Sequence, residues 1–151
     1  MKLKSFYPTV EEEKEIVRRM SKIGEIPSVQ PVMNGEDILE ARKIVNQIYI
    51  DEKVIDYILQ LVFATRAPQD YGVDAERLLL YGASPRSSIA LTIAGKARAF
   101  LSGRSFVTPN DIKEIAHDVL RHHLRRTYEA EAEDVSPDEI LDRILTTIPV
   151  P

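Results

Sequence analysis

Hydrophobic residues recur every three to four positions in six segments of the chain, a pattern that predicts six amphipathic helices. Capping boxes are expected at the starts of the first and the last, at Thr9 with Glu12 and at Ser136 with Glu139. The third segment is apolar on most sides and is therefore expected to be central. The fourth segment aligns the apolar residues Ile89, Ile93, Ala97 and Phe100. The predicted helices cover residues 9–23, 36–49, 51–66, 85–102, 108–119 and 136–148.

Two short stretches that precede predicted helices resemble each other. Tyr49-Ile50 comes before Asp51, and Phe106-Val107 comes before Thr108, so each has an aromatic residue, a β-branched residue and a helix cap. Because such short strands are not stable alone, we expect these two to pair. Chance agreement between two amphipathic helices explains the likeness equally well. The predicted fold is mainly α, a helical bundle of about six helices with one very short two-stranded β pairing.

The composition fits a globular chain and weighs against several classes of protein. The 151 residues suit one domain with a real core, and the formal net charge of -4 argues against a dedicated nucleic-acid binder. Cysteine is absent, which excludes disulfides and thiolate metal sites and fits a cytoplasmic location. No apolar run approaches the roughly 20 residues that span a membrane. The opening MKLKSFYPTVEEEKE has no apolar run behind its lysines and is not a signal peptide.

Three predicted helices begin with a hydroxyl residue and a proline, and one of these places a cation in its first turn. TPND and SPDE put acids at the positive end of their helices, whereas SPRS puts Arg86 there. Such a cation costs a few tenths to about 1 kcal/mol. An exposed arginine that tolerates this cost, or one paired with an acid on another helix, is the simpler explanation. A phosphate site is the functional alternative, because helix N-terminal N–H groups and a planar guanidinium both bind phosphate well.

Other polar clusters fit structural roles better than chemical ones. His122 and His123 are adjacent, so their side chains diverge by about 100° on a helix and do not converge on a metal. The basic stretch RHHLRR lies at the end of a helix. Its positive charges there interact favourably with the free carbonyl groups of the helix end and with the acidic residues of the following EAEAED. Asp111, beside Asn110, suits a helix cap, so no metal site is expected. Arg66 also suits a helix C-terminus, although contact with a neighbouring subunit stays open.

Six stretches identify a known family by their content, order and spacing: SFYPTVEEEKEIVRRM, IYIDEKVIDYILQLVFATRA, YGASPRSSIAL, SGRSFVTPNDI, VLRHHLRR and TTIPVP. Together they resemble the C-terminal lid of MoxR-type AAA+ ATPases, and magnesium-chelatase ATPase subunits have a similar lid. The resemblance covers nearly the whole chain. It implies that residues 1–151 form a single lid subdomain, without the large nucleotide-binding subdomain.

The resemblance also implies a role for the GASPR motif. Arg86 would be the sensor-2 arginine, which reaches the γ-phosphate of ATP, bound with Mg²⁺ in the large subdomain. Gly82, Ala83, Ser84 and Pro85 would present this arginine where lid and core meet. Family members form rings, often hexamers, that remodel partners in chaperone-like or metal-cofactor maturation roles. Their partners commonly include proteins with von Willebrand factor A domains.

The chain lacks two nucleotide-binding motifs that the resemblance leads one to expect in a whole member of the family. It contains no GxxxxGK[ST] phosphate loop, and AGKAR at 94–98 lies inside a helical pattern with no Ser or Thr after its lysine. No acidic Walker-B strand is present either. The chain therefore resembles a fragment cut just before KSFYP, and alone it is not expected to hydrolyse ATP.

Two alternatives to the lid interpretation stay open. A free-standing helical interaction module would use Leu78–Leu80 as a partner patch and would leave Arg86 as an ordinary surface residue. A DNA-binding helical domain would use RHHLRR, but the acidic net charge weighs against it.

Overall fold

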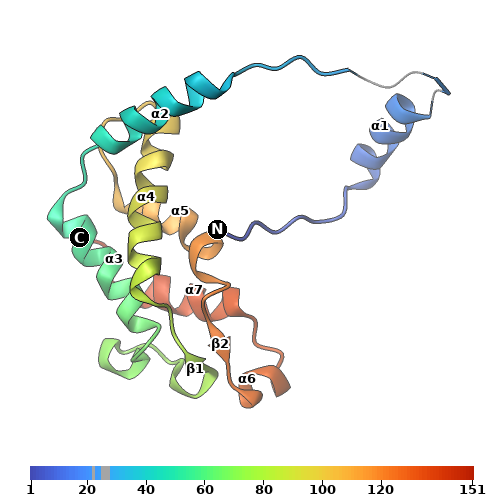
Figure 1. Cartoon of the computed structure of the whole chain (residues 1–151). Helices are drawn as coiled ribbons and strands as arrows, with labels where there is room; N and C mark the ends of the chain where they lie inside the picture. The colour runs from blue at the N-terminus through green and yellow to red at the C-terminus, as the bar shows by residue number, and fades with distance from the viewer. Residues whose placement is uncertain (22, 25–27) are drawn as a thin grey trace.

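The architecture is a mainly α bundle with one small sheet (Figure 1). The computed structural model describes residues 1–21, 23–24 and 28–151. Within these residues there are seven α-helices, two 3₁₀ turns and one two-stranded antiparallel sheet. In chain order they are α1 (Val10–Met20), α2 (Gly35–Gln47), α3 (Glu52–Ala64), η1 (Pro68–Tyr71), η2 (Glu76–Leu78), β1 (Leu79–Tyr81), α4 (Pro85–Leu101), α5 (Pro109–Leu120), β2 (Arg125–Arg126), α6 (Tyr128–Ala132) and α7 (Pro137–Thr147).

The predicted mainly α fold is confirmed, with differences at its edges. The six predicted helices correspond to α1–α5 and α7, and the short α6 was not predicted. Capping boxes form at Thr9 with Glu12 and at Ser136 with Glu139, as predicted. The first helix ends at Met20 instead of about Ile23. Part of that predicted end, and residues 25–27 of the loop after it, lie outside the described residues.

The core surrounds α3, which packs against α4, α5 and α7. Six α3 residues are buried: Val54, Tyr57, Ile58, Leu61, Val62 and Ala64. The central position expected from its apolar composition is therefore confirmed. In contrast, α1 lies apart from the other helices (Figure 1) and has no buried residue.

The predicted pairing of Tyr49 with Phe106 is present as an isolated parallel bridge. The N–H of Tyr49 donates to the Ser105 carbonyl, and the N–H of Val107 donates to the Tyr49 carbonyl, both at 2.9 Å. The sheet between β1 and β2 was not predicted. Its strands have three and two residues, too few to show a repeating pattern.

The buried face of α4 is not the face that carries the aligned isoleucines. Ile89 and Ile93 are each 60% exposed. The buried residues are Ser87, Leu91, Gly95 and Ala99. Small residues allow α4 to approach α5 closely, since a Cβ atom on Gly95 would lie 2.6 Å from Cδ1 of Ile112. The side of α4 that carries Ile89 and Ile93 is thus left facing outward, whereas Phe100 packs partly against the core.

Within the described residues, no helix combines the length and the apolar character needed to cross a membrane.

Candidate functional site

The candidate site is the segment Gly82–Arg86, which joins β1 to the first turn of α4. Ser84 is the N-cap of α4 and Pro85 its first residue, as predicted. However, the Ser84 side chain makes no capping hydrogen bond, whereas those of Thr108 and Ser136 do so at α5 and α7. The first turn of α4 also contains no acidic residue. Pro85 has no N–H group, and the N–H of Ser87 donates to the Ser84 carbonyl at 2.8 Å, so the N–H of Arg86 is the donor of this first turn that can bind an anion.

Arg86 lies in this first turn with its side chain exposed. In the part of the chain that the structure describes, no carboxylate pairs with it, so the alternative of an acid on another helix finds no partner there. A cation next to the positive helix end is more stable when an anion lies beside both. The arrangement can therefore bind an anion that the described residues do not supply.

The segment is held in place through Ala83, which is buried. Its N–H donates to Oγ1 of Thr65 at 2.8 Å, and its carbonyl accepts from Nε of Arg66 at 2.6 Å. Thr65 is the C-cap residue of α3, and its hydroxyl donates in turn to the Val62 carbonyl at 2.6 Å. Both polar atoms of Ala83 are thus satisfied by the two residues that follow the last turn of α3.

The close approach of this segment to Thr65 requires a glycine at position 82. A Cβ atom at this position would lie 2.1 Å from the carbonyl oxygen of Thr65 and 2.7 Å from its Oγ1. These distances are too short for any side chain. We call Thr65, Arg66, Gly82 and Ala83 together the α3–α4 junction.

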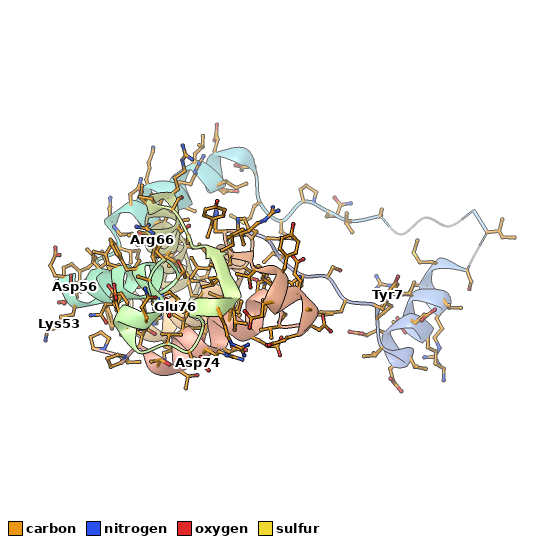
Figure 2. The ribbon with its side chains drawn as sticks, turned by 90° about the horizontal axis from the view of Figure 1, so that it is seen from below. Tyr7, Lys53, Asp56, Arg66, Asp74 and Glu76 are labelled. Carbon is orange, nitrogen blue, oxygen red and sulfur yellow. The ribbon has the colours of Figure 1, made fainter. Side chains whose placement is uncertain are left out.

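Arg66 belongs to the candidate site through a contact that was not predicted from the sequence. It does stand at the C-terminal end of α3, as predicted, and its side chain is exposed. Its guanidinium carbon lies 4.7 Å from the ring centroid of Phe63. Figure 2 shows Arg66 in the helical body, whereas Tyr7 lies with α1 away from it. The contact with Ala83 joins residues 17 positions apart, so no local pattern in the sequence could have indicated it.

The basic stretch RHHLRR is used largely within the fold. Arg121 donates to Asp118 at 2.5 Å and to Asp138 at 2.9 Å. Arg126 donates to the Val135 carbonyl at 2.8 Å. Arg121 and Arg126 are thus engaged within the fold, whereas Arg125 is exposed, and the engaged arginines weigh further against that alternative.

The histidines do not form a common site. Nε2 of His117 lies 3.0 Å from Oδ1 of Asp142. The rings of His122 and His123 contact each other, and burial, followed by nearby positive charge, lowers the pKa of both. Among the residues that the structure describes, no group of three or more His, Cys, Asp or Glu side chains is placed to hold a metal ion.

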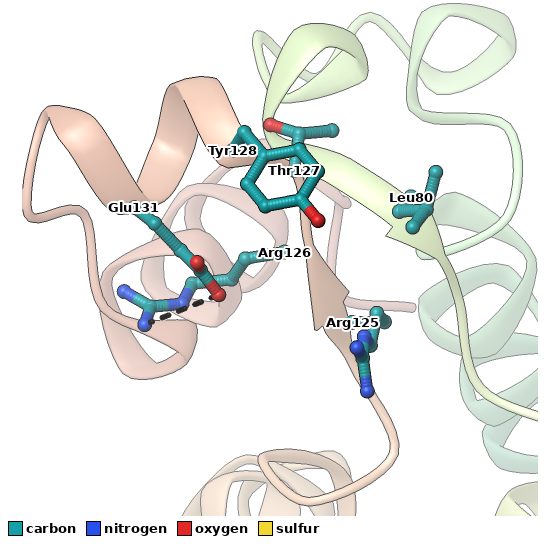
Figure 3. Close-up of a pocket in the computed structure, with 6 residues that line it drawn as sticks. All are labelled: Leu80, Arg125, Arg126, Thr127, Tyr128 and Glu131. Carbon is teal, nitrogen blue, oxygen red and sulfur yellow. Dashed lines mark ion pairs between the residues drawn. The ribbon is translucent and has the colours of Figure 1, made fainter.

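A pocket of about 180 Å³ lies beside the β1–β2 sheet and shares no residue with Gly82–Arg86 (Figure 3). It is lined by Leu80, Arg125, Arg126, Thr127, Tyr128 and Glu131. Arg126 and Glu131 approach to 4.0 Å across it. Of the proposed Leu78–Leu80 patch, Leu78 belongs to the core and only Leu80 is prominently exposed. The Leu78–Leu80 patch that the interaction-module alternative would use is therefore small.

Comparisons with known proteins agree with this architecture. The AAA lid domain family matches residues 72–144, which include the candidate site. Chaperone MoxR1 of Mycobacterium tuberculosis is 36% identical over 96% of this chain and 38% of its own length. Protein YeaC of Bacillus subtilis is 31% identical over 99% of this chain and 44% of its own length.

One solved structure extends the agreement to the fold. The crystal structure of a Cytophaga hutchinsonii protein assigned as an ATPase superposes with a TM-score of 0.91 at 42% identity. It covers 97% of this chain and 45% of its own chain. The chain thus spans less than half the length of these relatives. From the lid-domain match and the relatives that align over almost every residue, the chain belongs to the lids of MoxR-type AAA+ ATPases.

Proposed function

We propose that this lid acts on ATP bound with Mg²⁺ in a large AAA+ subdomain, and that Arg86 contacts the γ-phosphate. The observation that carries the proposal is the exposed guanidinium of Arg86 in the first turn of α4, with no anionic partner among the described residues. A phosphate fits this position, because the guanidinium offers a planar set of donors and lies beside the positive end of the helix dipole. Gly82, Ala83, Ser84 and Pro85 present the arginine at this position.

The outward face of α4 is apolar on the side that also carries Arg86, which favours a docked partner there. Ile89 and Ile93 follow Arg86 by three and seven positions, so the three residues share one helix face. Both isoleucines are 60% exposed. Burial of such side chains contributes about 1.5–3 kcal/mol each. We propose that the protein's own large subdomain covers this face when nucleotide is bound, which would bring the phosphate to Arg86.

Hydrolysis itself requires residues that this chain does not contain. It has no phosphate loop and no Walker-B strand. The large subdomain would supply these and the Mg²⁺ site, and the lid would supply the arginine. The 151-residue chain alone is therefore proposed to be inactive as an ATPase.

The wider role is proposed by analogy with the family. Lid motion against the core would couple ATP hydrolysis to remodelling of a partner protein within a ring of subunits, often a hexamer. A chaperone-like role agrees with the name of the mycobacterial relative. Proteins with von Willebrand factor A domains are the partner class to test first, and a cytoplasmic location fits such a machine.

The test is ATP turnover by the full-length ATPase with Arg86 intact and with Arg86→Ala. We expect turnover to fall at least tenfold, because an arginine at a transferring phosphoryl group contributes roughly 10³–10⁵ in rate. Arg42→Ala is the matched control, since Arg42 is exposed on α2, which packs on α4 near the end opposite to Arg86 (Figure 1). Equal turnover in wild type and Arg86→Ala would refute the sensor role.

A further inference from the structure

We infer that Thr65 and Arg66 are positioning residues for Arg86, acting through the backbone N–H and carbonyl of Ala83. The inference rests on the proposed contact of Arg86 with the γ-phosphate. It adds that the direction of Arg86 is set by the end of α3, and not by α4 alone.

The first argument is the way the junction holds Ala83. Its N–H and its carbonyl are bound by two consecutive residues, Thr65 and Arg66, at 2.8 and 2.6 Å. Hydrogen bonds to both the N–H and the carbonyl of one residue restrain its position and its rotation. Thr65 is 1% exposed, and its hydroxyl is also bound to the Val62 carbonyl, so the anchor itself is rigid.

The second argument is the short distance along the chain from this anchor to Arg86. Only Ser84 lies between Ala83 and Pro85, whose ring fixes its own φ angle. Proline also restricts the residue before it, and Ser84 is accordingly extended, with φ -81° and ψ 169°. Arg86 follows immediately in the helix. Few soft torsions therefore separate the anchored backbone of Ala83 from the arginine.

The third argument is the absence of room at Gly82. Because a Cβ atom there would meet the Thr65 backbone at 2.1 Å, the segment lies directly against the end of α3. A small shift of α3 relative to α4 must then move Ala83, and with it Arg86. The junction can in this way transmit a movement of the lid core to the nucleotide.

Accurate placement matters because a contact with a developing charge is sensitive to distance. A displacement of about 1 Å at a reacting centre can lower a rate by roughly 10²-fold. A variant that loosens the junction should therefore act like a weakened Arg86. It should impair recognition of the γ-phosphate and leave binding of the remainder of the nucleotide intact.

The experiment compares Thr65→Val with Thr65→Ser in the full-length ATPase. Valine has nearly the shape of threonine but cannot accept the hydrogen bond from Ala83, whereas serine can. The readouts are the affinities for a non-hydrolysable ATP analogue and for ADP, and turnover as a second measurement. Thr65→Val should weaken analogue binding about tenfold and ADP binding less than twofold. Thr65→Ser should restore both to within about twofold of wild type.

The decisive control is the same substitution in an Arg86→Ala background. If Thr65 acts through Arg86, the two changes are not additive, and Thr65→Val should alter analogue affinity less than twofold there. A full tenfold additional loss, or an equal loss of ADP binding, would show a merely structural role and overturn the inference. Should Thr65→Val fail to fold, Arg66→Ala removes the other bond to Ala83 from an exposed position and should give the same pattern.

The outcomes separate this inference from the proposed function. If Arg86→Ala by itself leaves analogue affinity and turnover unchanged, the proposed function fails. If Arg86→Ala impairs both and Thr65→Val and Arg66→Ala impair neither, Arg86 keeps its role and the positioning inference fails.

Discussion

The Cα atom of Gly82 lies so close to Thr65 that a Cβ atom would stand 2.1 Å from the Thr65 carbonyl oxygen. Neither partner of this contact can move aside easily, because the obstacle is backbone at the end of α3. We expect Gly82→Ala to lower the free energy of unfolding by about 1–3 kcal/mol, as measured by urea denaturation. Gly35→Ala is the control, since a Cβ atom there meets nothing within 4 Å. It should change stability by less than about 0.5 kcal/mol. Equal effects would mean that the close approach is not maintained in solution.

Gly95 makes a second close approach, with a different obstacle. A Cβ atom there would lie 2.6 Å from Cδ1 of Ile112, the far end of a side chain that can turn away. Alanine also improves helix propensity over glycine by about 1 kcal/mol. We expect Gly95→Ala to cost clearly less than Gly82→Ala in the same denaturation experiment. A larger cost at Gly95 would contradict this ranking of backbone against side-chain obstacles.

The ion pair between Arg104 and Asp111 makes stability depend on pH. Burial by itself would raise the pKa of Asp111, but hydrogen bonds from Arg104 and Thr108 outweigh it and hold this pKa below the usual 3.8. Because the folded-state pKa is the lower one, the stabilisation is complete above about pH 4 and is lost as pH falls through the folded-state value. We expect Asp111→Asn to reduce the free energy of unfolding by about 1.5–3 kcal/mol at pH 7.

The pH series supplies the check on this pair. The difference between wild type and Asp111→Asn should shrink when unfolding is measured at pH 3 and below. A difference that stays constant from pH 7 to pH 2 would assign the effect to packing instead of charge.

Substitutions on the outward face of α4 should affect the turnover of the full-length ATPase but not the stability of the lid. Ile89→Ser with Ile93→Ser should leave the melting temperature of the 151-residue chain within a few degrees, because both side chains are already 60% exposed. Leu91→Ala, on the buried face, should cost about 2–5 kcal/mol. In the full-length ATPase the isoleucine double variant should nevertheless lower turnover several-fold. Unchanged turnover would show that no partner covers this face.

Local chemistry accounts for what could be predicted from sequence. Helix caps such as Ser136 with Glu139 depend on residues three positions apart, and the structure contains them. The pairing of Tyr49 with Phe106 followed from two similar stretches, and it also forms. Arg86 could be selected as a candidate because its positive charge lies at the positive end of the helix dipole. This mismatch is visible within the four residues SPRS.

What could not be predicted depends on contacts between distant residues. The isoleucines of α4 have the same spacing whichever face is buried, and the outcome depended on how closely Gly95 lets α5 approach. Likewise, Thr65 and Ala83 are 18 positions apart and lie at the ends of different elements. Nothing in either local sequence indicates that one holds the other.

The most direct test of the central claim is the preference of the full-length ATPase for a non-hydrolysable ATP analogue over ADP, with Arg86 and with Arg86→Ala. These nucleotides differ at the γ-phosphate that Arg86 is proposed to contact. We predict that Arg86→Ala weakens analogue binding at least tenfold and changes ADP binding less than twofold, with an unchanged melting temperature. Unchanged affinity for both nucleotides, or an equal loss for both, would contradict the claim that Arg86 senses the γ-phosphate.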